Sequence, residues 1–462
     1  MSILIRGGRV VTASAEFVGD VYVEGGAVRL LGERLDLSAD EVIDATGKLV
    51  LPGGIDPHTH LDMAVGRGLV TSDDFDSGTA AALFGGTTTL IDFANQEPGH
   101  STFEALDDLK ARAAGKAHCD WSCHMTVTDM APDRLPELDA LVADGISSFK
   151  MFMAYPGRLY TDDRTRFRTY RHVAGLGGVI LMHAETGLVI DELVADAIAA
   201  GHTAPIWHAR TRPPELAAEA IHRSAVLAKL AGVPLYIVHM NSAQGVEAMR
   251  RAKADGVEIL GEVCPQYLHL DASWLERPDG GRYICSPPIR PLGHQEALWR
   301  ALLAGEFTTV ATDHAPFTTA ERALGAEDFR LIPNGLPGVE ERMSYLYSEG
   351  VVKRGLSLRE FVALTSTRAA QTFGLYPRKG TIAPGADADL LVWDPQVRRT
   401  LRAADPAIHH SRVDYSCYEG LEVQGGPEVV IQGGRVAVRG GALCSRGQGR
   451  FLRRGPYARP AV

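Results

Sequence analysis

The chain has 462 residues, of which 45% are hydrophobic and 23% charged, a composition typical of a globular protein with a large core. Its formal net charge is −10 and both signs are mixed along the sequence, which argues against nucleic acid as the main partner. No apolar run approaches the roughly 18 residues of a membrane span. Without a recognisable secretory signal, the scattered cysteines are expected to be reduced thiols of a cytoplasmic protein.

Both ends of the chain have the pattern of short strands joined by glycine turns. The stretch IRGGRVV at 5–11 nearly recurs as IQGGRVA at 431–437. We therefore expect 1–50 and 380–440 to form one small β-sandwich domain, although hairpins of similar composition also produce such repeats by chance. The arginine-rich stretch 441–462 is expected to be an exposed C-terminal arm, with a disordered end as the alternative.

Between these ends, over 51–379, short apolar strands alternate with helical stretches. Helical periodicity is clearest in 102–117, 213–232 and 294–306. This alternation predicts a parallel (β/α)8 barrel of the TIM type, an α/β fold, with an open doubly wound sheet as the alternative. The eight candidate strands are 49–56, 87–94, 120–127, 146–153, 178–185, 234–241, 257–264 and 308–315.

Polar residues interrupt these apolar strands near their carboxyl ends, which meet at one mouth of a parallel barrel. Burying such side chains is costly unless they find partners. Taken singly, each could be a core histidine, an ion-paired lysine or a turn-capping aspartate. Residues two apart on a strand face the same way, so His58 and His60 can hold one ion. Together the set predicts a metal centre made of His58, His60, Lys150, His183, His239 and Asp313.

The chemistry of this set favours two divalent ions. Imidazoles with one carboxylate suit zinc or a similar metal, and they are too numerous for one ion that must keep an open position. A protonated Lys150 would be repelled by two cations, whereas its carbamylated form would be an anionic bridge between them. The sequence shows only a lysine where an acidic bridge is needed. His314 should face away from Asp313 and is expected to be structural.

Motifs along nearly the whole chain carry a family resemblance. In order, the sequence contains GGIDPHTHL, SSFKMFMAY, LMHAE, IVHMNSA, SPPIR, ATDHAPF and IPNGLPGVEERM. In these motifs it resembles the cyclic amidohydrolases called dihydropyrimidinases and D-hydantoinases. The resemblance implies a barrel with a flanking β-sandwich, two zinc ions, a carboxylated lysine and a homotetramer that acts on small molecules.

The resemblance also implies roles for single residues. His58 and His60 with Asp313 would hold one metal, His183 and His239 the other, and Lys150 would bridge the two. Tyr155 would contact the reacting carbonyl. Ser286 and Asn334 would bind the ring amides, largely through backbone groups. The loops after the ligand-bearing strands are expected to form the pocket rim, although ordinary loop packing is the alternative for Met63, Leu69 and Phe152.

The implied reaction is hydrolytic ring opening of 5-substituted hydantoins, or of dihydropyrimidines such as dihydrouracil, to N-carbamoyl amino acids. A hydroxide shared by the two metals would attack, and Asp313 would carry its proton to the departing nitrogen. An allantoinase-like ureide hydrolase is one alternative. A non-catalytic scaffold on the same fold is another, which the retained ligand set disfavours. Asp62 stands where dihydroorotases place an arginine.

Overall fold

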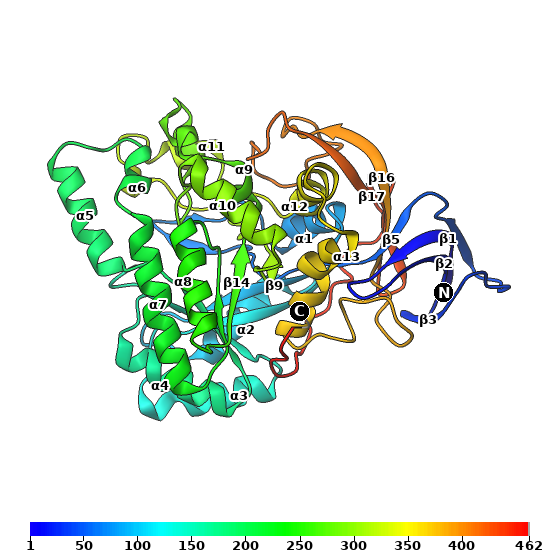
Figure 1. The fold of residues 1–462 in the computed structure, drawn as a ribbon, viewed down its shortest axis with the longest axis horizontal. Coiled ribbons are helices and arrows are strands. Elements are labelled where there is room, and N and C mark those ends of the chain that lie inside the picture. The colour runs from blue at the N-terminus through cyan, green and yellow to red at the C-terminus, as the bar shows by residue number, and fades with distance from the viewer. Residues whose placement is uncertain (461–462) are drawn as a thin grey trace.

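A computed structural model describes residues 1–460 as a barrel surrounded by helices, with a separate β-sheet packed at one side (Figure 1). Eight parallel strands form the barrel sheet and follow one another in chain order. They are β6 (Gly54–Asp56), β9 (Thr87–Asn95), β10 (Asp120–Thr126), β11 (Ser148–Phe152), β12 (Val179–His183), β13 (Leu235–Ile237), β14 (Ile259–Val263) and β15 (Thr309–Val310). Each coincides with a strand predicted from the sequence.

The first and last strands of this sheet meet just beyond β6 and β15. Thr59 and His314 form a parallel β-bridge, and the Thr312 hydroxyl donates to Asp56 over 2.6 Å. An open doubly wound sheet keeps its edge strands apart and reverses its strand order, so the contacts identify a (β/α)8 barrel. No helix within 1–460 is long and apolar enough to cross a membrane.

Helices connect the strands and cover the outside of the barrel. Local sequence explains their ends: Ser101 and Glu104 form a capping box at the start of α2, and α7 ends where Gly232 adopts a φ of +71°. The helices are α1 (Phe75–Phe84), α2 (Thr102–Ala113), α3 (Pro136–Ala143), α4 (Asp163–Gly175), α5 (Gly187–Ala199), α6 (Ile206–Arg210), α7 (Pro214–Ala231), α8 (Ala243–Ala254), α9 (Pro265–His269), α10 (Leu292–Leu303), α11 (Thr319–Ala323), α12 (Arg342–Leu346), α13 (Leu358–Val362) and α14 (Arg368–Thr372).

The two ends of the chain build the flanking sheet together, as predicted. Its nine strands are β1 (Ser2–Val11), β2 (Glu16–Glu24), β3 (Ala27–Gly32), β4 (Glu41–Asp44), β5 (Leu49–Pro52), β16 (Leu390–Thr400), β17 (Glu422–Gln432), β18 (Arg435–Arg439) and β19 (Ala442–Leu443). Strand β5 pairs with β1 and, antiparallel, with β16, which joins the N-terminal and C-terminal halves. Buried side chains from both halves share one core, including Ile3, Val23, Leu390 and Ile431.

The predicted strand 49–56 is in fact two strands, because the chain crosses from the flanking sheet to the barrel at two glycines. A Cβ on Gly53 would lie 2.2 Å from Thr88 Oγ1, and a Cβ on Gly54 would lie 2.6 Å from Met343 Sδ. Only glycine permits such close packing at this crossing. The glycines therefore allow β6 to enter the barrel and carry His58 and His60 to its mouth.

The C-terminal stretch does not project from the molecule as expected. Arg454 is buried; its Nε donates to Ser122 Oγ over 2.9 Å and its Nη2 to Ser148 Oγ over 2.7 Å. The Leu452 amide donates to the Trp121 carbonyl over 2.7 Å. The prediction of an exposed arm is wrong for 449–457, because backbone and polar groups of the barrel pair with these residues, whereas most of 441–448 is exposed or partly exposed. Residues 461–462 of the predicted arm lie outside the described residues.

A buried ionic cluster ties the barrel to the flanking sheet. The Lys379 ammonium, 1% exposed, lies 2.7 Å from Asp120 Oδ2 at the start of β10 and 2.5 Å from Asp389 Oδ2, which precedes β16. Asp387 Oδ2 is 3.1 Å from the same nitrogen. Removing one partner of such a cluster leaves buried charge without compensation.

The Lys379→Met substitution should therefore lower the free energy of unfolding by about 3–5 kcal/mol. Urea unfolding followed by circular dichroism measures the change. The matched control is Lys353→Met, because Lys353 is half exposed and its partner Glu349 keeps a second ion pair with Arg354, so its loss should change stability little. Equal stability of the two variants would contradict a structural role for the cluster.

Candidate functional site

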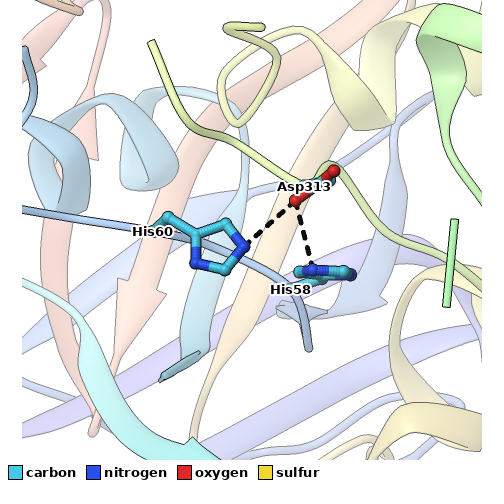
Figure 2. Close-up of side chains that lie close together, drawn as sticks. All are labelled: His58, His60 and Asp313. Atoms are coloured by element: carbon cyan, nitrogen blue, oxygen red, sulfur yellow. Dashed lines mark ion pairs between the residues drawn. The ribbon is translucent and has the colours of Figure 1, made fainter. Parts of the chain in front are cut away.

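Three predicted metal ligands form a compact cluster at the mouth of the barrel (Figure 2). The Nε2 atoms of His58 and His60 each lie 3.1 Å from Asp313 Oδ1. One donor atom from each residue lies within 4.8 Å of the others. The histidines follow β6 and the aspartate follows β15, so the closure of the barrel brings them together.

The other predicted ligands surround this cluster. The ring of His239, after β13, lies 5.5 Å from the ring of His58 and 4.6 Å from that of His183, at the end of β12. Lys150, in β11, places its ammonium nitrogen 5.1 Å from the Phe93 ring and 5.0 Å from the Phe152 ring. The structure thus brings together all the strand-end residues singled out in the sequence.

Burial and neighbouring charges together set the pKa of each of these groups. Burial lowers the pKa of Lys150 to about 8, against the opposing attraction of Asp313 and Glu262, and the ammonium has no ion pair within 1–460. Burial and the neighbouring His183 hold the pKa of His239 well below its usual value. For Asp313, burial alone would raise the pKa, but His58 and His60 hold it well below the usual range. The carboxylate therefore stays ionised.

The backbone is strained at these positions. His239 has a φ of +40°, Asp313 of +52° and Tyr155 of +60°, in a region that residues with side chains rarely adopt. Such strain persists where the surrounding structure enforces it, and it concentrates at functional sites.

The donor set fits a divalent metal ion. His60 Nδ1 and His239 Nδ1 are buried and have no hydrogen-bond partner among the described residues. A buried imidazole nitrogen without a partner is costly unless it binds something. Neutral imidazoles beside an ionised carboxylate are the ligands that zinc and similar ions take in catalytic sites.

Glu262, in β14, is a functional candidate that the sequence reading missed. Its Oε1 lies 2.7 Å from His58 Nδ1 and accepts the His239 amide over 2.8 Å, and its Oε2 accepts the Tyr236 hydroxyl over 2.9 Å. Burial alone would lower the pKa of His58, but Glu262 and Asp313 raise it to about 9, so without an ion the ring donates Nδ1–H to Glu262 and Nε2–H to Asp313. A metal ion bound at Nε2 would replace the second proton, while Glu262 keeps the first. The signal in the sequence was an acidic residue inside the apolar strand VEILGEVC at 257–264.

Two more carboxylates support the ligands. Glu185 Oε2 lies 2.9 Å from His183 Nε2, which fixes the orientation of that ring. Asp92 accepts the Thr59 hydroxyl over 3.0 Å and the Leu61 amide over 2.9 Å, so it anchors the loop that carries both N-terminal histidines. His314 turns away from the ligands, as predicted, and its Nε2 lies 3.0 Å from Asp73 Oδ2.

The residues expected to meet the substrate also lie together. The Tyr155 ring lies 5.3 Å from the His183 ring, and burial raises its pKa to about 12, so the phenol remains a donor at neutral pH. Asn334 Nδ2 donates to Ser286 Oγ over 3.2 Å. His208 was not predicted to take part, yet its Nε2 lies 3.1 Å from the same hydroxyl.

The three expected rim residues differ in depth. Phe152 is buried and its ring stacks on His183 at 5.3 Å, so it lines the metal centre. Met63 and Leu69 are partly exposed and lie at the hairpin of β7 (Ala64–Gly66) and β8 (Leu69–Val70). Arg67 in this hairpin donates to the Leu331 carbonyl, which ties the hairpin to the long segment after β15.

Comparison with known proteins gives this geometry its context. Two models described as Amidohydrolase family match residues 41–144 and 290–437. A D-hydantoinase of Geobacillus stearothermophilus is 46% identical over 99% of this chain and 97% of its own. The chain belongs to the D-hydantoinase and dihydropyrimidinase family of amidohydrolases.

Other relatives agree with this assignment. A dihydropyrimidinase of Rattus norvegicus is 40% identical over 99% of this chain and 89% of its own. The crystal structure of dihydropyrimidinase from Brevibacillus agri NCHU1002 superimposes with a TM-score of 0.97, at 46% identity and complete coverage of both chains. These relatives confirm the expected fold, a barrel with a flanking sheet, and the assignment as a cyclic amidohydrolase, a family that implies a metal site.

Because Glu262 holds His58 by its Nδ1 proton, Glu262→Gln should weaken metal binding about 10–100-fold. Competition with a fluorescent chelator measures the affinity. Glu258→Gln is the matched control, since Glu258 lies just before the same strand and contacts Tyr457 instead of a metal ligand. If both variants bound metal like the parent protein, Glu262 would have no part in the site.

Proposed function

We propose that this protein hydrolyses cyclic amides, opening the ring of 5-substituted hydantoins or of dihydropyrimidines such as dihydrouracil to give N-carbamoyl amino acids. The observation that carries the proposal is the meeting of His58, His60 and Asp313 with Lys150, His183 and His239 at one barrel mouth. The full-length similarity to proteins named D-hydantoinase and dihydropyrimidinase supports the substrate class.

The metal ligands are proposed in two groups. His58, His60 and Asp313 would hold one divalent ion, His183 and His239 the second, and Lys150, carboxylated by carbon dioxide, would bridge them. The donor set favours zinc for both ions. When bound, such ions polarise a carbonyl and lower the pKa of water toward about 7. A buried lysine without an ion pair supports the carbamate, because modification replaces a costly buried ammonium with a ligand.

Residues of the chain perform the remaining steps. Asp313, ionised and beside both N-terminal histidines, accepts a proton from the attacking water and passes it to the departing ring nitrogen. The Tyr155 hydroxyl donates to the carbonyl oxygen as negative charge develops there. Ser286 and Asn334 hold the amide edge of the ring, and Met63, Leu69 and Phe152 meet its substituent.

Several wider features complete the proposal. The protein acts as a cytoplasmic homotetramer on small molecules, without nucleic acid or membrane partners. Its chain divides into a β domain built from both ends of the chain, which takes in β5 and β19, and a barrel between them, against which residues 449–457 pack. All six proposed ligands are present, and the backbone is strained at two of them, His239 and Asp313. Both features favour an enzyme over a non-catalytic scaffold on the same fold.

Zinc-loaded protein should open dihydrouracil, hydantoin and phenylhydantoin rings much faster than allantoin, and removal of metal by a chelator should abolish turnover. Release of the carbamoyl product is measured with each of these substrates. The metal-free protein is then reloaded with zinc, either with or without bicarbonate, and assayed again. Full recovery should need bicarbonate, because Lys150 takes up carbon dioxide. Preference for allantoin would favour the ureide hydrolase, and no metal or turnover under any condition would favour the scaffold.

Tyr155→Phe should lower kcat about 10²–10³-fold while the metal content stays at the parent value, since it removes a donor to the developing oxyanion. Stopped assays and metal analysis on the same sample measure both. Tyr160→Phe is the control, because Tyr160 follows in the same loop and is not expected at the carbonyl. Unchanged kcat in Tyr155→Phe would refute the oxyanion role.

A further inference from the structure

His208 lies beside the proposed substrate site, although it follows no barrel strand. It belongs to α6 and is 2% exposed. Its Nε2 lies 2.9 Å from the Cys285 carbonyl oxygen and 3.1 Å from Ser286 Oγ. On the other side of the ring, Arg212 Nη1 lies 3.1 Å from Nδ1. The imidazole thus connects a guanidinium to a serine at the active site.

These contacts fix the protonation of the ring. A carbonyl oxygen only accepts, so His208 Nε2 carries the proton, and a guanidinium only donates, so Nδ1 is the acceptor. Both contacts require the same neutral tautomer. Burial and the charge of Arg212 agree with this, because they hold the pKa of His208 well below its usual value.

The fixed tautomer determines how Ser286 is used. Its Oγ shares the Nε2–H of His208 with the nearer Cys285 carbonyl and, over 3.2 Å, receives an Nδ2–H of Asn334. With these two donors at the oxygen, the serine hydroxyl hydrogen must turn toward an acceptor, and without a substrate the Tyr155 oxygen takes that place. Asn334 Oδ1 is buried and has no hydrogen-bond partner within 1–460. A donor and an acceptor therefore lie side by side, close to Tyr155.

We propose that His208, held by Arg212, is a positioning residue that presents the Ser286 hydroxyl to the substrate. The hydroxyl donates to the C2 carbonyl of the ring, and Asn334 Oδ1 beside it accepts the adjacent ring N–H. This pair matches the C=O and N–H edge of a cyclic imide or ureide. The inference rests on the proposed function and adds a side-chain contact to the backbone contacts expected for these two residues. A site built for such hydrogen bonds discriminates against rings that lack them.

The test compares hydantoin with 2-thiohydantoin, whose sulfur accepts hydrogen bonds poorly. His208→Phe keeps the aromatic volume but removes both ring nitrogens. It should raise KM for hydantoin about 10-fold, as expected for one lost hydrogen bond, and change kcat less. The preference for hydantoin over the thio compound, measured as a ratio of kcat/KM values, should fall by a similar factor. Metal content should stay at the parent value.

Two further variants separate positioning from folding. His208→Gln can still donate to the Cys285 carbonyl and should recover part of the preference. His202→Phe is the matched control, because His202 precedes the same helix and stacks on Trp207 instead. A parent-like KM and ratio in a folded His208→Phe would overturn the inference alone. Absence of turnover in the metal-loaded parent protein would instead overturn the proposed function.

Discussion

The contact between the first and last barrel strands is the constraint on which the site depends. Asp56 accepts the Thr312 hydroxyl at the point where the barrel closes, and Asp313 follows directly. This closure places its carboxylate 3.1 Å from imidazoles that are more than 250 residues away in sequence. These ligands come from the first and last strands of the barrel, so they meet only when the barrel is closed. Folding of the barrel and formation of the site are therefore a single event.

Support for the ligands comes from strands between these two. Glu262 contacts the His58 side chain and the His239 backbone through one oxygen, so it links the two proposed metal positions. His239, whose φ is +40°, donates its amide to that carboxylate over 2.8 Å. Strain in the backbone is thereby offset by a hydrogen bond to a charged group, which is stronger than one between neutral groups.

The barrel strands and the strand-end residues could be predicted because they follow local rules: apolar runs of strand length and polar groups too costly to bury without partners. The division of 49–56 into two strands at Gly53 could not be predicted, because a continuous apolar run is typical of one strand. The close contact between Gly53 and Thr88, which leaves no room for a Cβ, appears only in the structure. The role of Glu262 could not be predicted, because the sequence does not show which side chain a buried carboxylate contacts. Its contacts with His58 and His239 appear only in the folded barrel. Arg454 was misjudged because arginine-rich ends favour exposure, and its partners Ser122 and Ser148 come from strands more than 300 residues earlier.

The same groups couple metal binding to stability. His60 and His239 each bury a nitrogen without a partner, and Lys150 buries an ammonium between two aromatic rings. These buried groups oppose folding, and the proposed cations with a carboxylated Lys150 would reduce that cost. Since a cation that binds only the folded chain shifts the equilibrium toward it, the electrostatic cost of the site becomes a source of metal affinity. The proposed metal centre would therefore make the stability of the barrel depend on the supply of metal.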